Sequence, residues 1–148
     1  MSAVRTPWNS YRQVAMQTAA PGQLVLMLFE GAIRFLDRAE AGFGMDDPAE
    51  ANQTIHNNIH RAQAILHELN MALDIQSGGH LAETLRALYE YMDRRLLESN
   101  LRKQPEGISE TRRHLSKLCE AWSGMLQGRG RSEPGEPASA SVSVSVAA

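Results

Sequence analysis

Histidine is the residue type in this 148-residue chain whose spacing comes closest to a chemical site. His56 and His60 stand four positions apart, so on a helix both would project from one face and could hold a metal ion. The glutamate of a His-Glu-x-x-His zinc site is replaced by Asn57. None of the five histidines follows an acidic residue at the Glu-x-x-His spacing of di-iron bundles. We therefore expect exposed histidines beside a core face, with a metal-dependent bundle enzyme at this pair as the alternative.

Other catalytic patterns are absent from the sequence. Cys119 is the single cysteine, which excludes an internal disulfide and any multi-cysteine metal centre. It shares helical spacing with Leu115 and Trp122, as a buried small hydrophobic residue would. No glycine precedes a lysine and no Gly-x-Gly-x-x-Gly occurs, so a phosphate-binding loop is not expected. The sequence predicts a protein that is not an enzyme and needs no cofactor.

Composition narrows the class of partner. The formal net charge is -2, which gives no strong attraction to nucleic acid or to an anionic membrane. No stretch has the eighteen or so apolar residues of a membrane span, and residues 1–17 lack the basic region and apolar core of a secretory signal. Aromatic residues make up only 5%, while leucine, alanine and methionine are plentiful, which favours helices. We expect a cytoplasmic, all-α protein without membrane insertion.

Apolar residues recur every three or four positions in four segments between Pro21 and Gln127. The stripes are Val25, Leu28, Phe29, Ala32 and Leu36; Ile55, Ile59, Ala62, Leu66, Leu69 and Leu73; Leu81, Leu85, Leu88, Met92 and Leu96; and Ile108, Thr111, Leu115, Leu118, Trp122 and Met125. Gly42 and Gly44 are expected to separate the first two segments, Gly78-Gly79 the next two, and Pro105 with Gly107 the last two. Asp47 followed by Pro48 predicts the start of the second helix. Short breaks between such stripes predict an antiparallel up-down four-helix bundle.

Outside these stripes the sequence predicts two flanking regions. Residues 1–20 are expected to form a flexible N-terminal arm, residues 21–127 the bundle, and residues 128–148 a disordered tail of small residues. The alternating run Ser141–Val146 leaves a β-augmentation strand as the alternative for the tail.

Several apolar residues lie off the predicted stripes. Residues 24–29 are all apolar and cover every side of a helix, which indicates either a deeply buried helix or a second apolar face for a partner. On the second interpretation, the partner-binding side chains of the helices are Leu26, Met27, Met71, Ile75, Leu97 and Leu101. Binding through such residues would be hydrophobic, as when an amphipathic helix lies in an apolar groove.

Two ordered blocks resemble the flagellar secretion chaperone FliS family. The first runs from Thr18-Ala19-Ala20-Pro21 to Met27-Leu28-Phe29-Glu30-Gly31-Ala32-Ile33-Arg34-Phe35-Leu36, where the family typically reads Thr-Ala-Ser-Pro and Met-Leu-Tyr-Asp-Gly-Ala-Ile-Arg-Phe-Leu. The second, Leu88 to Lys103, resembles the family's third helix, and Ala121-Trp122 matches an Ala-Trp pair near the end of the last helix. The resemblance runs from about Tyr11 to Met125 and does not cover the loop around Gly44 or the tail.

The resemblance implies an export chaperone for flagellin. Such a chaperone binds the disordered C-terminal segment of flagellin in the cytosol, prevents premature polymerisation and keeps flagellin competent for flagellar type III secretion. The resemblance also implies the flagellar export gate as a partner. It further implies that the N-terminal arm, which contains Tyr11, covers the groove as a lid. A helical adaptor or regulator that binds another partner through the same groove is the alternative function, and both a monomer and a swapped homodimer stay open.

Overall fold

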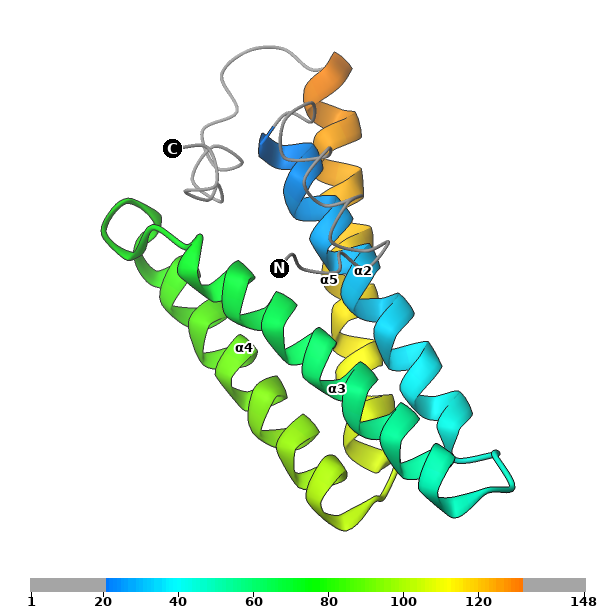
Figure 1. Ribbon diagram of the computed structural model, residues 1–148. Helices are drawn as coiled ribbons and strands as arrows, with labels where there is room; N and C mark the ends of the chain where they lie inside the picture. The colour runs from blue at the N-terminus through cyan, green and yellow to red at the C-terminus, as the bar shows by residue number, and fades with distance from the viewer. Residues whose placement is uncertain (1–20, 132–148) are drawn as a thin grey trace, which may run out of the picture.

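Four α-helices joined by short loops make up residues 21–131, the part of the chain that the computed structural model describes (Figure 1). In chain order they are α2 (Pro21–Gly42), α3 (Pro48–Met71), α4 (Ile75–Arg102) and α5 (Glu106–Arg131). The predicted all-α four-helix bundle is confirmed. The last helix continues four residues past the predicted boundary at Gln127. The predicted arm (residues 1–20) and residues 132–148 of the predicted tail lie outside the described residues.

The start of α3 follows the predicted capping chemistry. Asp47 has an extended backbone, and its carboxylate accepts a hydrogen bond from the backbone N–H of Ala49 at 3.1 Å. Pro48 occupies the first helical position, where a missing N–H costs nothing. This cap satisfies one of the donors that a helix N-terminus leaves free.

The break between α3 and α4 differs from the prediction. The second helix was expected to continue to Gly78-Gly79, but α3 ends at Met71. Asp74 then begins a new helix because its carboxylate accepts the backbone N–H of Ser77 at 3.0 Å, and this hydrogen bond lowers the pKa of Asp74. Gly79 adopts φ +60°, ψ -136° and kinks the first turns of α4 instead of ending α3.

Gly107 was expected to break the chain, yet it is the second residue of α5. A Cβ atom here would lie 2.4 Å from Ser99 Oγ and 2.5 Å from the carbonyl oxygen of Arg95. The glycine therefore lets the start of α5 approach the backbone of α4 closely. Lys103, in the left-handed conformation with φ 51°, ends α4 just before this contact.

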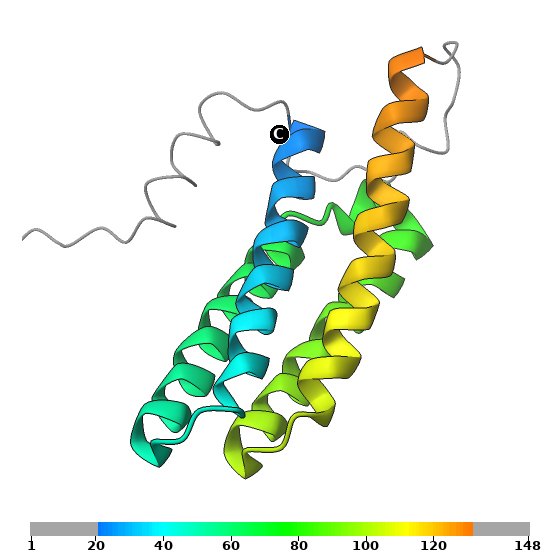
Figure 2. The same ribbon diagram turned by 90° about the vertical axis from the view of Figure 1, so that its right-hand side faces the viewer.

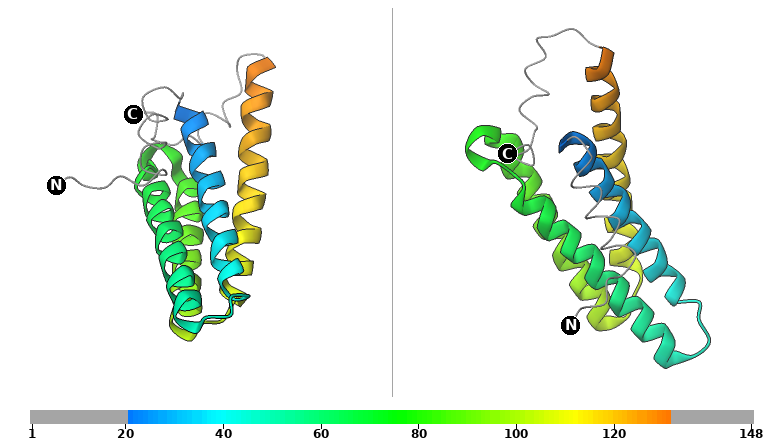
Figure 3. Two further views of the ribbon diagram at one scale, coloured as in Figure 1. Left: turned by 45° about the vertical axis from the view of Figure 1, so that its right-hand side comes forward. Right: turned by 45° about the horizontal axis from the view of Figure 1, so that its top comes forward.

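Neighbouring helices are antiparallel, and α2 packs most extensively on α3. Toward one end of the bundle the helices separate into two pairs, α2 with α5 and α3 with α4. Each helix packs mainly on two neighbours, and direction alternates along the chain, as the colours in Figures 1 and 2 show. The pairs lie close together where loops 43–47 and 103–105 connect the helices, which we call the closed end. They diverge toward loop 72–74 and the helix ends at Pro21 and Arg131, which we call the open end; Figure 1 and the right panel of Figure 3 agree on this divergence.

The core contains side chains from all four helices and is most completely filled away from the open end. Its large fully buried apolar members are Leu36, Ile59, Leu66, Met92, Leu96, Ile108 and Leu115. Each comes from a predicted stripe, so hydrophobic periodicity identified this part of the core. Burial of each such side chain contributes about 1.5–3 kcal/mol to folding.

A candidate partner-binding cleft

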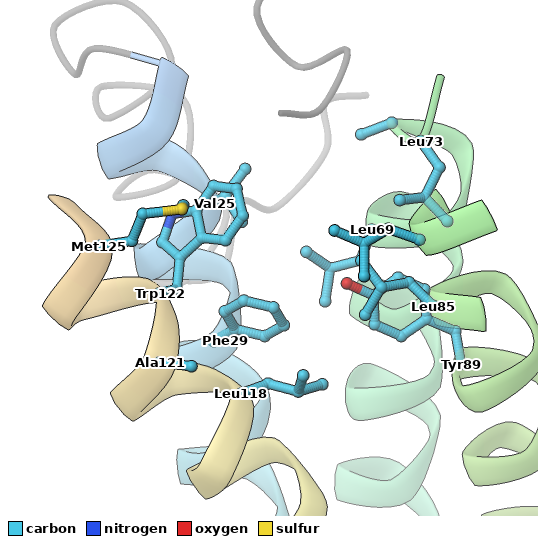
Figure 4. A pocket seen from close by; sticks show the side chains of 12 residues that line it. Val25, Phe29, Leu69, Leu73, Leu85, Tyr89, Leu118, Ala121, Trp122 and Met125 are labelled. Carbon is cyan, nitrogen blue, oxygen red and sulfur yellow. The ribbon is translucent and has the colours of Figure 1, made fainter. Parts of the chain in front are cut away.

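An apolar cleft of about 210 Å³ lies between the two helix pairs at the open end. Its lining side chains are Val25 and Phe29 of α2; Leu69, Ala72 and Leu73 of α3; Leu81, Leu85 and Tyr89 of α4; and Leu118, Ala121, Trp122 and Met125 of α5. Figure 4 shows the side chains of α2 and α5 facing those of α3 and α4 across the opening. Nearly all the lining atoms are carbon or sulfur, so the cleft suits an apolar partner segment.

The α2–α5 wall is held in place by Trp122. Its indole Nε1 donates a hydrogen bond to the carbonyl oxygen of Gly22 at 2.8 Å, which ties α5 to the first turn of α2. The ring also meets Phe29 edge to face, with 6.4 Å between centroids and 71° between planes. A Cβ at Gly22 would lie 2.8 Å from Leu126 Cδ2, so the two helices are in close contact here. The indole face therefore has a fixed orientation in the cleft.

The α3–α4 wall combines one buried phenol with half-exposed leucines. Tyr89 is 4% exposed, and burial raises the pKa of its hydroxyl, which stays protonated at physiological pH. Leu81 is 42% exposed and lies in the part of α4 that follows loop 72–74. Arg86 Nε donates to Asn70 Oδ1 at 3.1 Å and joins α4 to α3. The wall is therefore held by polar contacts while its cleft face stays apolar.

The cleft lining contains no acidic, basic or histidine side chain. No residue of its lining is a nucleophile activated by a base, and burial raises the pKa of nearby Cys119, whose thiol stays protonated. In the described part of the chain no three histidine, cysteine, aspartate or glutamate residues gather where a metal could bind. His56 and His60 are exposed, with 4.4 Å between ring centroids, and the His56 Nδ1 lies 3.0 Å from the Asn100 amide nitrogen. None of the four helices is long and apolar enough to cross a membrane.

The off-stripe residues predicted to bind a partner fall into different places. Met71 (70% exposed), Leu97 (49%) and Leu101 (76%) project into solvent. Leu26 is only 9% exposed, so the expectation that it belongs to an exposed face is wrong, and Met27 is half-buried. This first helix places ten residues in the interior, as the buried-helix interpretation expected.

The predicted site residues are not gathered into one surface. Leu97 and Leu101 lie near the closed end of α4, whereas Met71 ends α3 at the open end. Ile75 is the first residue of α4, and Tyr11 lies outside the described residues. Whether these residues bind a partner stays a prediction.

Most of the residues that line the cleft were assigned to the core by sequence reasoning, whereas Ala72, Tyr89 and Ala121 were in none of the predicted stripes. Leu69, Leu85, Leu118 and Trp122 continue the same stripes that fill the closed end. Periodicity identifies which face of a helix is apolar but contains no information on how far two helices diverge. One signal was available: Trp and Met concentrate near the end of the last stripe, and both residue types are enriched in binding surfaces.

Comparison with known proteins places the chain near flagellar proteins. Residues 4–129 match the family described as "Flagellar protein FliS". The "Flagellar secretion chaperone FliS" of Bacillus subtilis is 30% identical over 133 residues, which cover 90% of this chain and 96% of that protein. The protein of the same name from Salmonella typhimurium is 38% identical over 118 residues, covering 77% of this chain and 85% of that protein. The one from Escherichia coli is 34% identical over 119 residues, with 77% and 85% covered.

Proposed function

Because this chain belongs to the FliS family of flagellar secretion chaperones, a class that is not enzymatic, we propose that its client is flagellin. In this proposal the protein binds the disordered C-terminal segment of flagellin in the cytoplasm. Binding covers the surface through which flagellin polymerises, and the client reaches the flagellar export gate still unfolded. The function needs an apolar binding surface and no bound cofactor.

The apolar cleft at the open end is the observation that supports this proposal. Its walls present leucine, methionine and aromatic side chains at helical spacing from all four helices. A client helix with apolar residues at i, i+3, i+4 and i+7 can lay that face between the two pairs. A disordered segment that folds as it binds typically buries about 1,000–3,000 Å², more than this cleft provides, so the client must also contact other surfaces.

Leu97 and Leu101 form the further surface that we assign to the client. They are one helical turn apart on α4 and are the exposed apolar pair toward the closed end. At about 100° per residue they lie on a different face of α4 from Leu85 and Tyr89, so a client that occupies the cleft must wrap around α4 to cover both. Met71, the last residue of α3, is a further exposed apolar side chain at the open end.

Calorimetry with a flagellin C-terminal peptide tests the proposal. Ala121 lines the cleft and is exposed, so Ala121→Glu places a charge in the binding surface without filling the core. We expect the affinity to fall by about tenfold or more, since each 1.4 kcal/mol of lost binding energy is tenfold. Ala87→Glu is the matched control because Ala87 is also an exposed helical alanine but does not line the cleft.

The same titration separates the alternatives. Native protein that does not bind the peptide would contradict the flagellin proposal and favour a helical adaptor with another partner. Equal weakening by Ala121→Glu and Ala87→Glu would contradict the cleft as the site. Leu97→Glu should weaken binding with little change in melting temperature, because its side chain is half in solvent in the native bundle.

The predicted lid has its own test. Deleting residues 1–17 should increase self-association of the free protein in light scattering and leave peptide affinity unchanged or higher, because a closed lid lowers apparent affinity. A monodisperse deletion variant with much weaker binding would instead make the arm a contact surface for the client.

A further inference from the structure

A polar cluster joins α4 to α5 just below the cleft. The Tyr91 hydroxyl donates to Glu110 Oε2 at 2.5 Å, and Arg95 Nε donates to Glu110 Oε1 at 2.7 Å. His114 Nε2 lies 3.5 Å from Glu110 Oε2, and its ring meets Tyr91 edge to face. We call these four residues the clasp. The Glu110 carboxylate on α5 thus accepts hydrogen bonds from two donors on α4. Hydrogen bonds to an ionised carboxylate are stronger than those between neutral groups.

The α2–α5 pair is tied together at both ends. At the open end the Trp122 indole donates to the Gly22 carbonyl at 2.8 Å. At the closed end the Ser109 hydroxyl donates to Glu40 Oε2 at 2.8 Å. These contacts hold the two helices in register along their length.

The α3–α4 pair is tied in the same way. Arg86 donates to Asn70 at 3.1 Å near the open end, and Gln63 Nε2 donates to the Asp93 carbonyl at 3.3 Å in the middle. Near the closed end the Asn100 amide meets His56 at 3.0 Å. These three contacts hold α3 and α4 in register.

The two pairs contact each other through α2 and α3, which pack most extensively and bring Arg61 over the Phe35 ring at 5.9 Å, and through α4 and α5. On the α4–α5 side the clasp joins the pairs by hydrogen bonds, and it lies at the base of the cleft. Tyr89 of the cleft lining is two residues from Tyr91, and Leu118 is four residues from His114. One helical turn rises 5.4 Å, so the clasp lies about one turn from the cleft lining, toward the closed end. Beyond it the described hydrogen bonds between helices join α2 to α5 and α3 to α4.

We propose that the clasp sets the angle between the two helix pairs and thereby the width of the cleft, with Glu110 as its positioning residue. Near the closed end the approach of Gly107 to the Arg95 carbonyl leaves the pairs little room to move. Toward the open end the cleft walls are separated by open space, so small rotations about the clasp change the width there most. Where the cleft is the client site, as proposed above, the clasp selects which client segments fit.

Distances between paired spin labels across the cleft test this proposal without any client. Labels at Ala87→Cys on α4 and Glu120→Cys on α5, in a Cys119→Ser background, report the separation of the two pairs. Glu110→Gln should broaden the distance distribution. Glu98→Gln is the matched control, because Glu98 also binds Arg95 at 2.7 Å but lies on α4 and links no second helix. An unchanged distribution in Glu110→Gln, or equal broadening in Glu98→Gln, would overturn the proposal.

A second variant guards against a loss of folding. Tyr91→Phe keeps the ring beside His114 and removes one donor to Glu110, so it should broaden the distribution less than Glu110→Gln. Labels at Ala64→Cys and Ala87→Cys, both within the α3–α4 pair, should keep their distance in every variant. If Glu110→Gln fails to fold, Tyr91→Phe decides the outcome. A broadened distance distribution in Tyr91→Phe would support the proposal, and an unchanged one would overturn it.

Client affinity gives a separate readout. If Glu110→Gln leaves one molecule in ten with the binding-competent width, the apparent Kd for the flagellin peptide rises about tenfold. Broadened distances with no peptide binding by native protein would contradict the proposed client and leave the clasp intact. Native binding with unchanged distances in both clasp variants would contradict the clasp alone.

Discussion

The closed and open ends of the bundle contain the same kind of apolar stripe but differ in what covers it. Near the closed end Leu96 and Ile108 are fully buried, and α5 approaches α4 so closely that only glycine fits at position 107. At the open end the stripes continue into the walls of a cleft, where Leu81 is 42% exposed.

Under the proposed function, one helical pattern serves stability at one end and binding at the other. Where the pairs converge, apolar side chains cover one another and stabilise the fold. Where the pairs diverge, the same residue types stay accessible to a partner. A large exposed apolar surface is uncommon in a protein that has no binding partner for it. Substitution of an apolar residue at the closed end should therefore reduce mainly stability, and substitution at the open end should reduce mainly peptide affinity.

The largest expected effect comes from truncating one leucine at each end of the same helix. Leu96→Ala removes a fully buried side chain and should lower the free energy of unfolding by about 2–5 kcal/mol. Leu85→Ala, in the half-exposed cleft wall, should cost no more than about 1.5 kcal/mol. Urea unfolding of both variants measures this, and peptide calorimetry should rank them in the opposite order. A larger stability loss in Leu85→Ala would mean that the cleft is part of the core.

Two glycines at close helix contacts give the next comparison. Gly107→Ala places a Cβ 2.5 Å from the Arg95 carbonyl oxygen, a backbone atom with little freedom, and should cost about 1–3 kcal/mol. Gly22→Ala meets only the end of the Leu126 side chain, which can rotate away, so its cost should be below about 1 kcal/mol. Thermal unfolding of the two variants decides whether the closed end is the more rigid one. Equal losses would contradict that difference.

The clasp should give stability a dependence on acidic pH. Hydrogen bonds from Tyr91 and then Arg95, with His114 nearby, lower the pKa of Glu110 to about 2. An unfolded glutamate titrates near about 4.3, so this stabilisation is complete above that pH and is lost as the pH falls toward 2. Between pH 5 and pH 3 the native urea midpoint should drop more than that of Glu110→Gln. The cleft lining has no group that titrates in this range, so equal drops would remove the clasp as the source.

The smallest effect is expected at the surface pair of Arg112 and Asp37, which joins α5 to α2 toward the closed end. Both side chains are substantially exposed, at 40% and 48%. Arg112→Ala should change stability by no more than about 1 kcal/mol, with a smaller difference in high salt. Chemical unfolding at low and high salt measures this. A larger, salt-independent loss would show that the Arg112 side chain contributes through packing.

The fold was predictable because helical stripes and caps are local signals. The four stripes and the Asp47 cap all appear in the structure. The end of α3 was missed because the weak helix signal from Met71 to Gly78 gave no sign that Asp74 would cap a new helix. The candidate site was not predictable in the same way, since the lining of the cleft depends on how two helix pairs diverge. Leu26 was misplaced because a hydrophobic residue off one stripe can still be covered by the fold.

The two ends of the described chain lie on the same side of the bundle as the cleft. Pro21 begins α2 and Arg131 ends α5, both at the open end in Figure 1. Under the proposed function, a flagellin segment joined by a flexible linker to Pro21 in place of residues 1–20, or to Arg131 in place of residues 132–148, would therefore begin beside the cleft. A linker of n flexible residues spans about 5–6 Å × √n, so a short one holds such a segment at a local concentration in the millimolar range. Client segments too weak to bind as free peptides could be compared in this tethered form.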